Sequence, residues 1–327
     1  MDVLWISGGE ATPRPVEDVP ALLARDDGFA WVDIPETDAE SAKFLSEAFG
    51  FHEMALRDCQ VRSHVPKLRT YPDHVFLILH APDRGDAGHV HLLELDQFIG
   101  RNFLVTVHGP LGEGVSVDAA LTETRAVRTR IEQGRFQPES AAELSHAIVS
   151  RVVLKMEAYV SSLASEIAAL ERRVMKTTFK NPEEILEEMF QVRHELLTIR
   201  TMAGQSRDAY MRMAKISRYL PADGAPLIDD VADQLDRVRS LCEQEKDFLQ
   251  GVLEFFESRT NTKINIAMER LALIAALLLP ISAVASIYGM NVIVNQSTRL
   301  AHLGVVLGIM GVVTLLMLRW TKRQGWW

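Results

Sequence analysis

Residues 271–291 read LALIAALLLPISAVASIYGMN, an almost uninterrupted apolar run that closes on Tyr288-Gly289-Met290-Asn291. A second apolar run covers residues 303–318. Each run approaches the roughly 20 residues that an α-helix needs to cross the hydrocarbon core of a bilayer. Because the connection between the runs is too short for a domain, we predict a transmembrane helical hairpin with spans at about 268–289 and 302–319.

Basic residues flank this hairpin unequally. Three precede the first run, three follow the second, and one lies between them: Arg259, Lys263 and Arg270; Arg319, Lys322 and Arg323; and Arg299. Cytosolic ends of spans carry the excess of Lys and Arg, so we expect a multi-pass protein of the cell (inner) membrane with both termini in the cytosol.

Net charge differs between the soluble part of the chain and the predicted hairpin. From residue 264 onward there are one acid and five bases, a net charge of +4. Because the whole chain has a net charge of −9, residues 1–263 have a net charge of −13. An acidic soluble part argues against nucleic acid as a partner and is compatible with attracting cations. No G-x-G-x-x-G, P-loop or H-E-x-x-H motif is present, so the sequence favours neither an enzyme nor ATP-driven transport.

The first part of the chain alternates between short strand patterns and helical patterns. Strands are predicted at 3–6, 29–34, 74–80, 89–99 and 103–108, helices at 37–49 and 52–60, and a hairpin connection at 81–88. We therefore expect residues 1–114 to form a cytosolic α/β domain with a largely antiparallel sheet.

The remaining cytosolic part, residues 115–263, is predicted to be helical and to include a stalk. Helices are expected at 117–132, at about 138–174 and at 181–219, the last with Asn181 as its N-cap. The final helix has apolar residues at helical spacing and would run from about 225 to 288, or roughly 95 Å at about 1.5 Å per residue. A helix of that length suits a rod that joins a cytosolic body to a membrane. The expected fold class is α+β, with a transmembrane pore domain at 264–327.

Polar and small residues of the first span fall on one stripe of the helix. Asn265, Met268, Ala272, Ala275, Leu279, Ser282, Ser286 and Gly289 follow each other at intervals of three or four residues. Polar side chains inside a span usually face a bundle interior or a water-filled path. The alternative is that the serine hydroxyls bond to their own backbone carbonyls. Since two spans cannot enclose a water path, a pore requires a homo-oligomer.

Tyr288-Gly289-Met290-Asn291, placed between a long stalk helix and a second span, resembles the Gly-Met-Asn signature of the CorA family. The resemblance implies a homopentameric funnel whose first spans line the pore and whose signature selects the ion. The stretch from Asn265 through Met268 to Leu271 is similar to the inner pore segment of the family, with one polar ring and two apolar rings that close the pore. Leu279-Pro280-Ile281-Ser282 resembles the mid-pore segment.

The resemblance also implies cation sites outside the span. The sequence around Asp229, Asp230 and Asp233 is similar to the region where family members bind regulatory Mg²⁺ between subunits. Glu254 resembles the acidic ring at the membrane end of the stalk. The alternative for the aspartates is that acids in the first turns of a helix interact favourably with its dipole.

The family resemblance implies a passive Mg²⁺ channel, also permeable to Co²⁺ or Ni²⁺, that cytosolic Mg²⁺ gates. One departure concerns the outer loop, where many members have Met-Pro-Glu. Here residues 292–299 contain no acid and one base, Arg299. A Zn²⁺ importer of the same fold, ZntB-like and with or without proton coupling, is therefore the alternative. A membrane-tethered scaffold without transport would have no need of the polar stripe.

Overall fold

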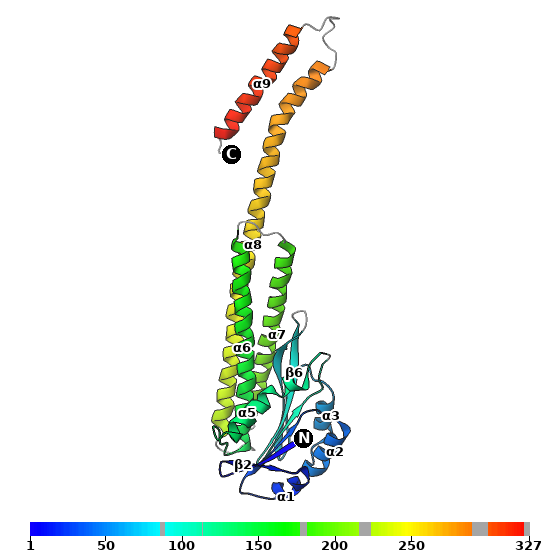
Figure 1. The fold of residues 1–327 in the computed structure, drawn as a ribbon. Helices are drawn as coiled ribbons and strands as arrows, with labels where there is room; N and C mark the ends of the chain where they lie inside the picture. Colours follow the sequence, from blue (N-terminus) through cyan, green and yellow to red (C-terminus); the bar gives the residue numbers. More distant parts are fainter. Residues whose placement is uncertain (86–88, 113, 177–181, 216–223, 290–299, 324–327) are drawn as a thin grey trace. The chain divides into compact units, whose positions relative to one another are not determined.

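The computed structural model describes residues 1–85, 89–112, 114–176, 182–215, 224–289 and 300–323 (Figure 1). The chain divides into two compact units, Met1–Val252 and Leu253–Trp327. The long helix α8, Gly224–Gly289, begins in the first unit and ends in the second. The single helix predicted for residues 225–288 is thus confirmed.

A seven-stranded sheet with the order β2-β1-β3-β7-β6-β5-β4 organises the first unit. Its strands are β1 (Asp2–Ser7), β2 (Glu10–Arg14), β3 (Phe29–Ile34), β4 (Lys67–Thr70), β5 (His74–Arg84), β6 (Val90–Gly100) and β7 (Phe103–His108). Among the described strands, only the β3–β7 pairing is parallel, so the prediction of a largely antiparallel sheet is confirmed.

Three details of the sheet differ from the prediction. The edge strands β2 and β4 were not predicted, because they are short and their side chains are mostly exposed or half-buried, so neither shows a buried apolar face. The predicted connection at 81–88 was wrong for its first residues. Pairing continues to Arg84, which lies opposite Val90, because the β5–β6 ladder extends past the apolar part of each strand.

Short helices cover one face of this sheet and enclose its apolar core. They are the 3₁₀ turn η1 (Val16–Asp18), α1 (Val19–Leu23), α2 (Ala39–Phe49) and α3 (Glu53–Gln60). Leu45 of α2 and Cys59 of α3 are fully buried against strand residues such as Phe76 and Phe98. Phe51, between α2 and α3, stacks on Phe98 with ring centroids 4.0 Å apart. This burial of aromatic surface fixes the helices on the sheet.

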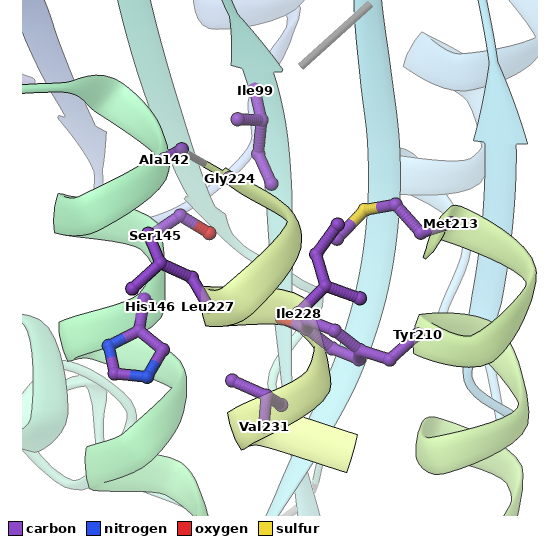
Figure 2. A pocket seen from close by; sticks show the side chains of 10 residues that line it. All are labelled: Ile99, Ala142, Ser145, His146, Tyr210, Met213, Gly224, Leu227, Ile228 and Val231. Atoms are coloured by element: carbon purple, nitrogen blue, oxygen red, sulfur yellow. The ribbon is translucent and has the colours of Figure 1, made fainter. Parts of the chain in front are cut away.

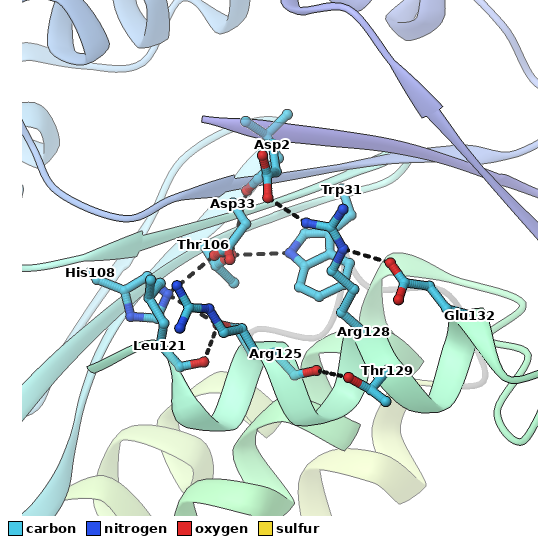
Figure 3. A network of polar contacts seen from close by, with 12 residues as sticks. Asp2, Trp31, Asp33, Thr106, His108, Leu121, Arg125, Arg128, Thr129 and Glu132 are labelled. Atoms are coloured by element: carbon cyan, nitrogen blue, oxygen red, sulfur yellow. Dashed lines mark hydrogen bonds and ion pairs between the residues drawn. The ribbon is translucent and has the colours of Figure 1, made fainter. Parts of the chain in front are cut away.

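A network of polar contacts joins β3 and β7 on the other face (Figure 3). Trp31 Nε1 donates to the Thr106 hydroxyl at 3.0 Å, and that hydroxyl donates to Asp33 Oδ1 at 2.5 Å. His108 Nε2 lies 3.1 Å from the same carboxylate oxygen and 3.3 Å from the hydroxyl of Thr124. The buried polar groups therefore connect the parallel strand pair to the helix that carries Thr124.

Helices continue the chain as α4 (Val117–Ala120), α5 (Thr122–Glu132), α6 (Ala141–Met175), α7 (Pro182–Lys215), α8 and α9 (Leu300–Arg323). The prediction of one helix over 117–132 was wrong, because the helix breaks at Leu121. The Thr122 hydroxyl donates to the Asp118 carbonyl at 3.0 Å, a side-chain bond that competes with the backbone pairing of a continuous helix. Asn181, the predicted N-cap of α7, and residues 216–219 lie outside the described residues.

In the first unit, α6, α7 and the start of α8 pack together through apolar faces. Ile148, Leu163, Ile199 and Val238 are fully buried. Ion pairs border this packing, with Arg200 of α7 2.7 Å from Glu243 of α8 and Arg237 of α8 3.7 Å from Glu157 of α6. The helices α6 and α7 thus hold the N-terminal part of α8 in a defined position in the first unit.

Candidate pore and cation sites

The apolar part of α8 meets the requirements of a membrane span. Among the described helices, only α8 is long and apolar enough to cross a bilayer, and no residue of its most apolar window is buried. The apolar part of α9, Gly304–Trp320, is shorter. The first predicted span therefore has the expected physical properties, and the second stays a prediction.

The stripe predicted to line the pore is exposed along α8. Asn265 and Ser282 are exposed, and so are Met268 (56%), Leu271 (68%) and Leu279 (68%). The half-buried positions of this part of α8 are different ones: Leu273, Ala276, Leu277, Pro280, Ile281 and Val284. Nothing within the described chain covers the polar stripe, and apolar residues on other faces of this part of α8, such as Ile274 and Ile287, are exposed as well.

Pro280 lies inside α8, between Leu279 and Ser282 of the stripe. Proline has no backbone N–H, so the carbonyl of the residue four positions earlier loses its usual helical partner. α8 continues past this position to Gly289.

The signature motif falls at the end of α8. Tyr288 and Gly289 are the last residues of the helix. Met290 and Asn291, together with the loop to residue 299, lie outside the described residues. The role of the motif therefore stays a prediction.

Asp230 lies in the first turns of α8 and is bonded within its own chain. Its Oδ2 is 2.7 Å from His146 Nε2 and accepts a bond from Gln234 Nε2 at 2.6 Å. The hydrogen bond from His146 lowers the pKa of the Asp230 carboxyl, with a further contribution from Gln234. The side chain of Asp230 is 54% exposed. It therefore presents an ionised carboxylate that a neighbouring molecule can reach.

His146 was not predicted as part of this region. It lies 84 positions before Asp230, and an isolated histidine on a helix gives no local signal of its partner. His146 of α6 lines a small pocket next to the start of α8, together with Tyr210, Ile228 and Val231 (Figure 2). Most of the lining is apolar, so the polar contact to Asp230 lies at the edge of a hydrophobic packing surface.

The other predicted cation ligands are also exposed. Asp233 lies one turn after Asp229, and both face solvent. Glu254 is exposed in the second unit. Within the described part of the single chain, no group of three or more His, Cys, Asp or Glu side chains is arranged to hold a metal ion.

Known proteins resemble this chain over nearly its whole length. The sequence model of the CorA-like Mg²⁺ transporter protein matches residues 26–323. The cobalt/magnesium transport protein CorA of Thermotoga maritima is 23% identical over 289 residues, 86% of this chain and 78% of that protein. The CorA magnesium transporter of Methanocaldococcus jannaschii has a similar structure, with a TM-score of 0.81 at 17% identity over 100% of this chain and 99% of that one.

The fold of the first part of the chain is shared more widely. The ZntB cytoplasmic domain of Vibrio parahaemolyticus aligns with a TM-score of 0.63 at 10% identity, over 80% of this chain and 98% of that domain. At that identity the likeness concerns the fold alone.

The match to the CorA-like family model extends from β3 to the end of α9 and includes the Tyr288–Asn291 motif. The chain therefore belongs to the CorA-like Mg²⁺ transporter family.

Proposed function

We propose that the chain is one subunit of a homopentameric divalent-cation channel of the cell membrane, with Mg²⁺ as the ion that it conducts passively. The observation that carries this proposal is the family match over residues 26–323, which includes the exposed polar stripe of α8. In this proposal α8 and α9 both cross the bilayer, both termini are cytosolic, and five copies of α8 surround the pore.

The residues of the stripe suit a hydrated ion. Mg²⁺ is small and loses its water reluctantly, so a selective ring does better to accept hydrogen bonds from the water shell than to replace it. Amide oxygens of Asn291 and backbone carbonyls near Gly289 would form that ring at the outer end. Rings of Asn265 and Ser282 would offer further polar contacts.

Apolar rings supply the closed state. Met268 and Leu271 project from the exposed side of α8, so five copies of each would form a constriction without polar groups. A narrow apolar constriction can lose its water and stop conduction without a physical plug.

Cytosolic Mg²⁺ is the proposed regulator. The exposed Asp230 and Asp233 would bind Mg²⁺ together with groups of the neighbouring subunit, and Mg²⁺ needs only one or two carboxylates because it keeps most of its waters. Tighter binding to the closed arrangement would shift the population toward that state. An aspartate with its ordinary pKa is also ionised at neutral pH, so the support for this role comes from the exposure of the Asp230 carboxylate.

A Zn²⁺ importer of the same fold is the second candidate function. Residues 292–299 contain Arg299 and no acid, so the outer loop lacks the Met-Pro-Glu acid of many family members. A ring of five arginines at a pore entrance would repel Mg²⁺ and Zn²⁺ alike, so uptake measurements and not the charge of the loop distinguish the two ions.

Uptake by the purified protein in liposomes tests the proposal. Mg²⁺, Co²⁺, Ni²⁺ and Zn²⁺ are compared with and without a pH gradient, with protein-free liposomes as the control. We expect Mg²⁺ to enter without a gradient, and Co²⁺ or Ni²⁺ to follow more slowly. Uptake of Zn²⁺ alone, or uptake that needs the gradient, would contradict the Mg²⁺ channel and support the importer.

A further inference from the structure

The sheet face that α3 covers contains a pair of buried acids. Glu94 and Asp96 lie two positions apart on β6, so their side chains point to the same face. His80 of β5 is the cross-strand neighbour of Glu94. The exposed fractions are 5% for Glu94, 0% for Asp96 and 1% for His80, and Cys59 of α3 is at 0%. Acids are almost never this deeply buried without a partner.

Too few hydrogen-bond donors reach the carboxylates of Glu94 and Asp96. The backbone N–H of Ser63 donates to Glu94 Oε2 at 2.6 Å, and His80 Nε2 donates to the Ser63 carbonyl at 2.7 Å. That bond places the proton of a neutral His80 on Nε2, so its Nδ1 is an acceptor. In the part of the chain that the structure describes, Glu94 Oε1, both Asp96 oxygens and His80 Nδ1 have no hydrogen-bond partner.

The charged groups nearby do not compensate for two carboxylates. Asp58 and Cys59 of α3, Arg62 and His64 of the segment 61–66, and Lys67 of β4 are the titratable or charged groups that act on Glu94, Asp96 or His80. Lys67 is 3.1 Å from Asp58, and Arg62 donates to the Leu92 carbonyl at 3.3 Å. The Cys59 thiol that α3 brings toward Asp96 is a weak donor.

A buried carboxylate without donors is costly, and such a group takes up a proton instead. A metal ion is the other way to satisfy clustered acceptors, but the described residues form no group arranged to hold one. One proton on the pair removes one of two buried like charges and converts one acceptor oxygen into an O–H donor. A proton is therefore the ligand that the geometry favours.

We propose that Glu94 and Asp96 form a buried proton-binding site, which keeps at least one proton at neutral pH and thereby holds α3 and the segment 61–66 on the sheet. Loss of the proton would leave two like charges on one face of β6 in a medium of low polarity. Water would then enter beneath Ser63, and the segment 61–66 would separate from the sheet. The fold would thus respond to alkaline conditions in the cytosol.

The expected pH dependence has a definite sign. Burial raises the pKa of Glu94 to about 7 from its usual 4.5, and burial together with the Glu94 charge raises the pKa of Asp96 well above its usual value. The folded chain therefore binds the proton more tightly than the unfolded chain. The bound proton therefore contributes fully to the free energy of unfolding below the pKa that these carboxyls have in the unfolded chain. This contribution is lost as the pH rises through their pKa in the folded chain.

Infrared spectroscopy of the full chain in detergent tests the site directly. A protonated carboxylic acid has a carbonyl stretching band that carboxylates lack. We expect the wild type to show this band at neutral pH and Asp96→Asn to lose or shift it, whereas Glu47→Gln, which removes an exposed acid of α2, leaves it unchanged. A wild type without the band at neutral pH would overturn the proposal. So would a band that added Mg²⁺ abolishes, because a cation would then occupy the site.

Hydrogen exchange tests the proposed opening. After correction for the intrinsic effect of pH, protection of the Ser63 amide should fall by up to about tenfold per pH unit above the folded pKa, because one proton is released. Amides of β1 serve as the internal control. The double variant Glu94→Gln, Asp96→Asn should remove this pH dependence, since neither amide can ionise. An equal pH dependence of Ser63 protection in the variant and the wild type would contradict the proposal. If the variant does not fold, the presence or absence of the infrared band in the wild type tests the proposal instead.

Discussion

His146 Nε2 of α6 lies 2.7 Å from Asp230 Oδ2 at the start of α8, so a predicted regulatory ligand is bonded within its own subunit. Gln234 donates to the same oxygen at 2.6 Å. The other carboxylate oxygen is left for a ligand from outside. Since one or two carboxylates are enough for a largely hydrated Mg²⁺, the contact orients Asp230 without excluding a bound ion.

Replacing Asp230 should weaken closure by Mg²⁺. We expect Asp230→Ala to need a higher Mg²⁺ concentration for protection of the closed assembly from limited proteolysis, because a carboxylate ligand is removed. His146→Ala is the matched control, since it breaks the same contact but keeps the carboxylate. Identical protection midpoints in Asp230→Ala and wild type would place the regulatory site elsewhere and leave Asp230 as a helix-start residue.

Asn291→Ala should abolish uptake of Mg²⁺ while the oligomer stays intact. The amide is predicted to accept hydrogen bonds from the water shell of the ion, and alanine offers no such acceptor. Flux into liposomes is measured beside the size of the purified assembly. Asn295→Ala, a substitution in the same loop, should retain uptake. Normal flux in a correctly assembled Asn291→Ala protein would remove Asn291 from the selectivity ring.

Met268→Ala and Leu271→Ala should raise the leak of Mg²⁺ through the closed channel. Smaller side chains widen the apolar constriction, so water enters it more easily. The measurement is flux at high Mg²⁺ on the cytosolic side. Ile266→Ala is the control, because Ile266 is exposed on another side of α8. Lower flux at normal expression would argue against a hydrophobic gate at these positions.

Tyr159→Phe should destabilise the helical packing of the first unit. The Tyr159 hydroxyl donates to Glu195 Oε2 at 2.7 Å, and Glu195 is only 1% exposed. Burial raises the pKa of Glu195, so its carboxyl depends on the few donors that reach it. Removing one should cost about 1–3 kcal/mol of unfolding free energy in urea titrations of the solubilised protein. Ser165→Ala, which removes an exposed hydroxyl bonded within its own helix, should change stability far less.

The parts of the fold that depend on local sequence could be predicted. Ser140 caps α6, close to the predicted start at about 138, and α8 ends at Gly289, one residue after the predicted end at about 288. Features that depend on distant residues could not be predicted in this way. Trp31 Nε1 donates to the Thr106 hydroxyl 75 positions later, and no periodicity of apolar residues reveals that contact.

The candidate sites likewise combine features that local sequence predicts with features that depend on distant residues. Helical spacing predicts the polar stripe on one face of α8, and Asn265, Ser282 and Ser286 of the stripe are exposed. The partner of Asp230 comes from a helix 84 positions earlier and appears only when α6 and α8 pack together. The burial of Glu94 and Asp96 likewise depends on α3 covering the sheet, although their alternation on β6 is visible in the sequence.

The central claim, that the exposed stripe of α8 lines a cation pore, is tested most directly by thiol block of Mg²⁺ uptake. Both native cysteines, Cys59 and Cys242, are buried, so Ser282→Cys adds one accessible thiol. Ile287→Cys, about 140° away around the helix at 3.6 residues per turn, is the control. We predict that a bulky, water-soluble thiol reagent stops Mg²⁺ uptake through Ser282→Cys and spares Ile287→Cys. Undiminished uptake through fully labelled Ser282→Cys would contradict the account.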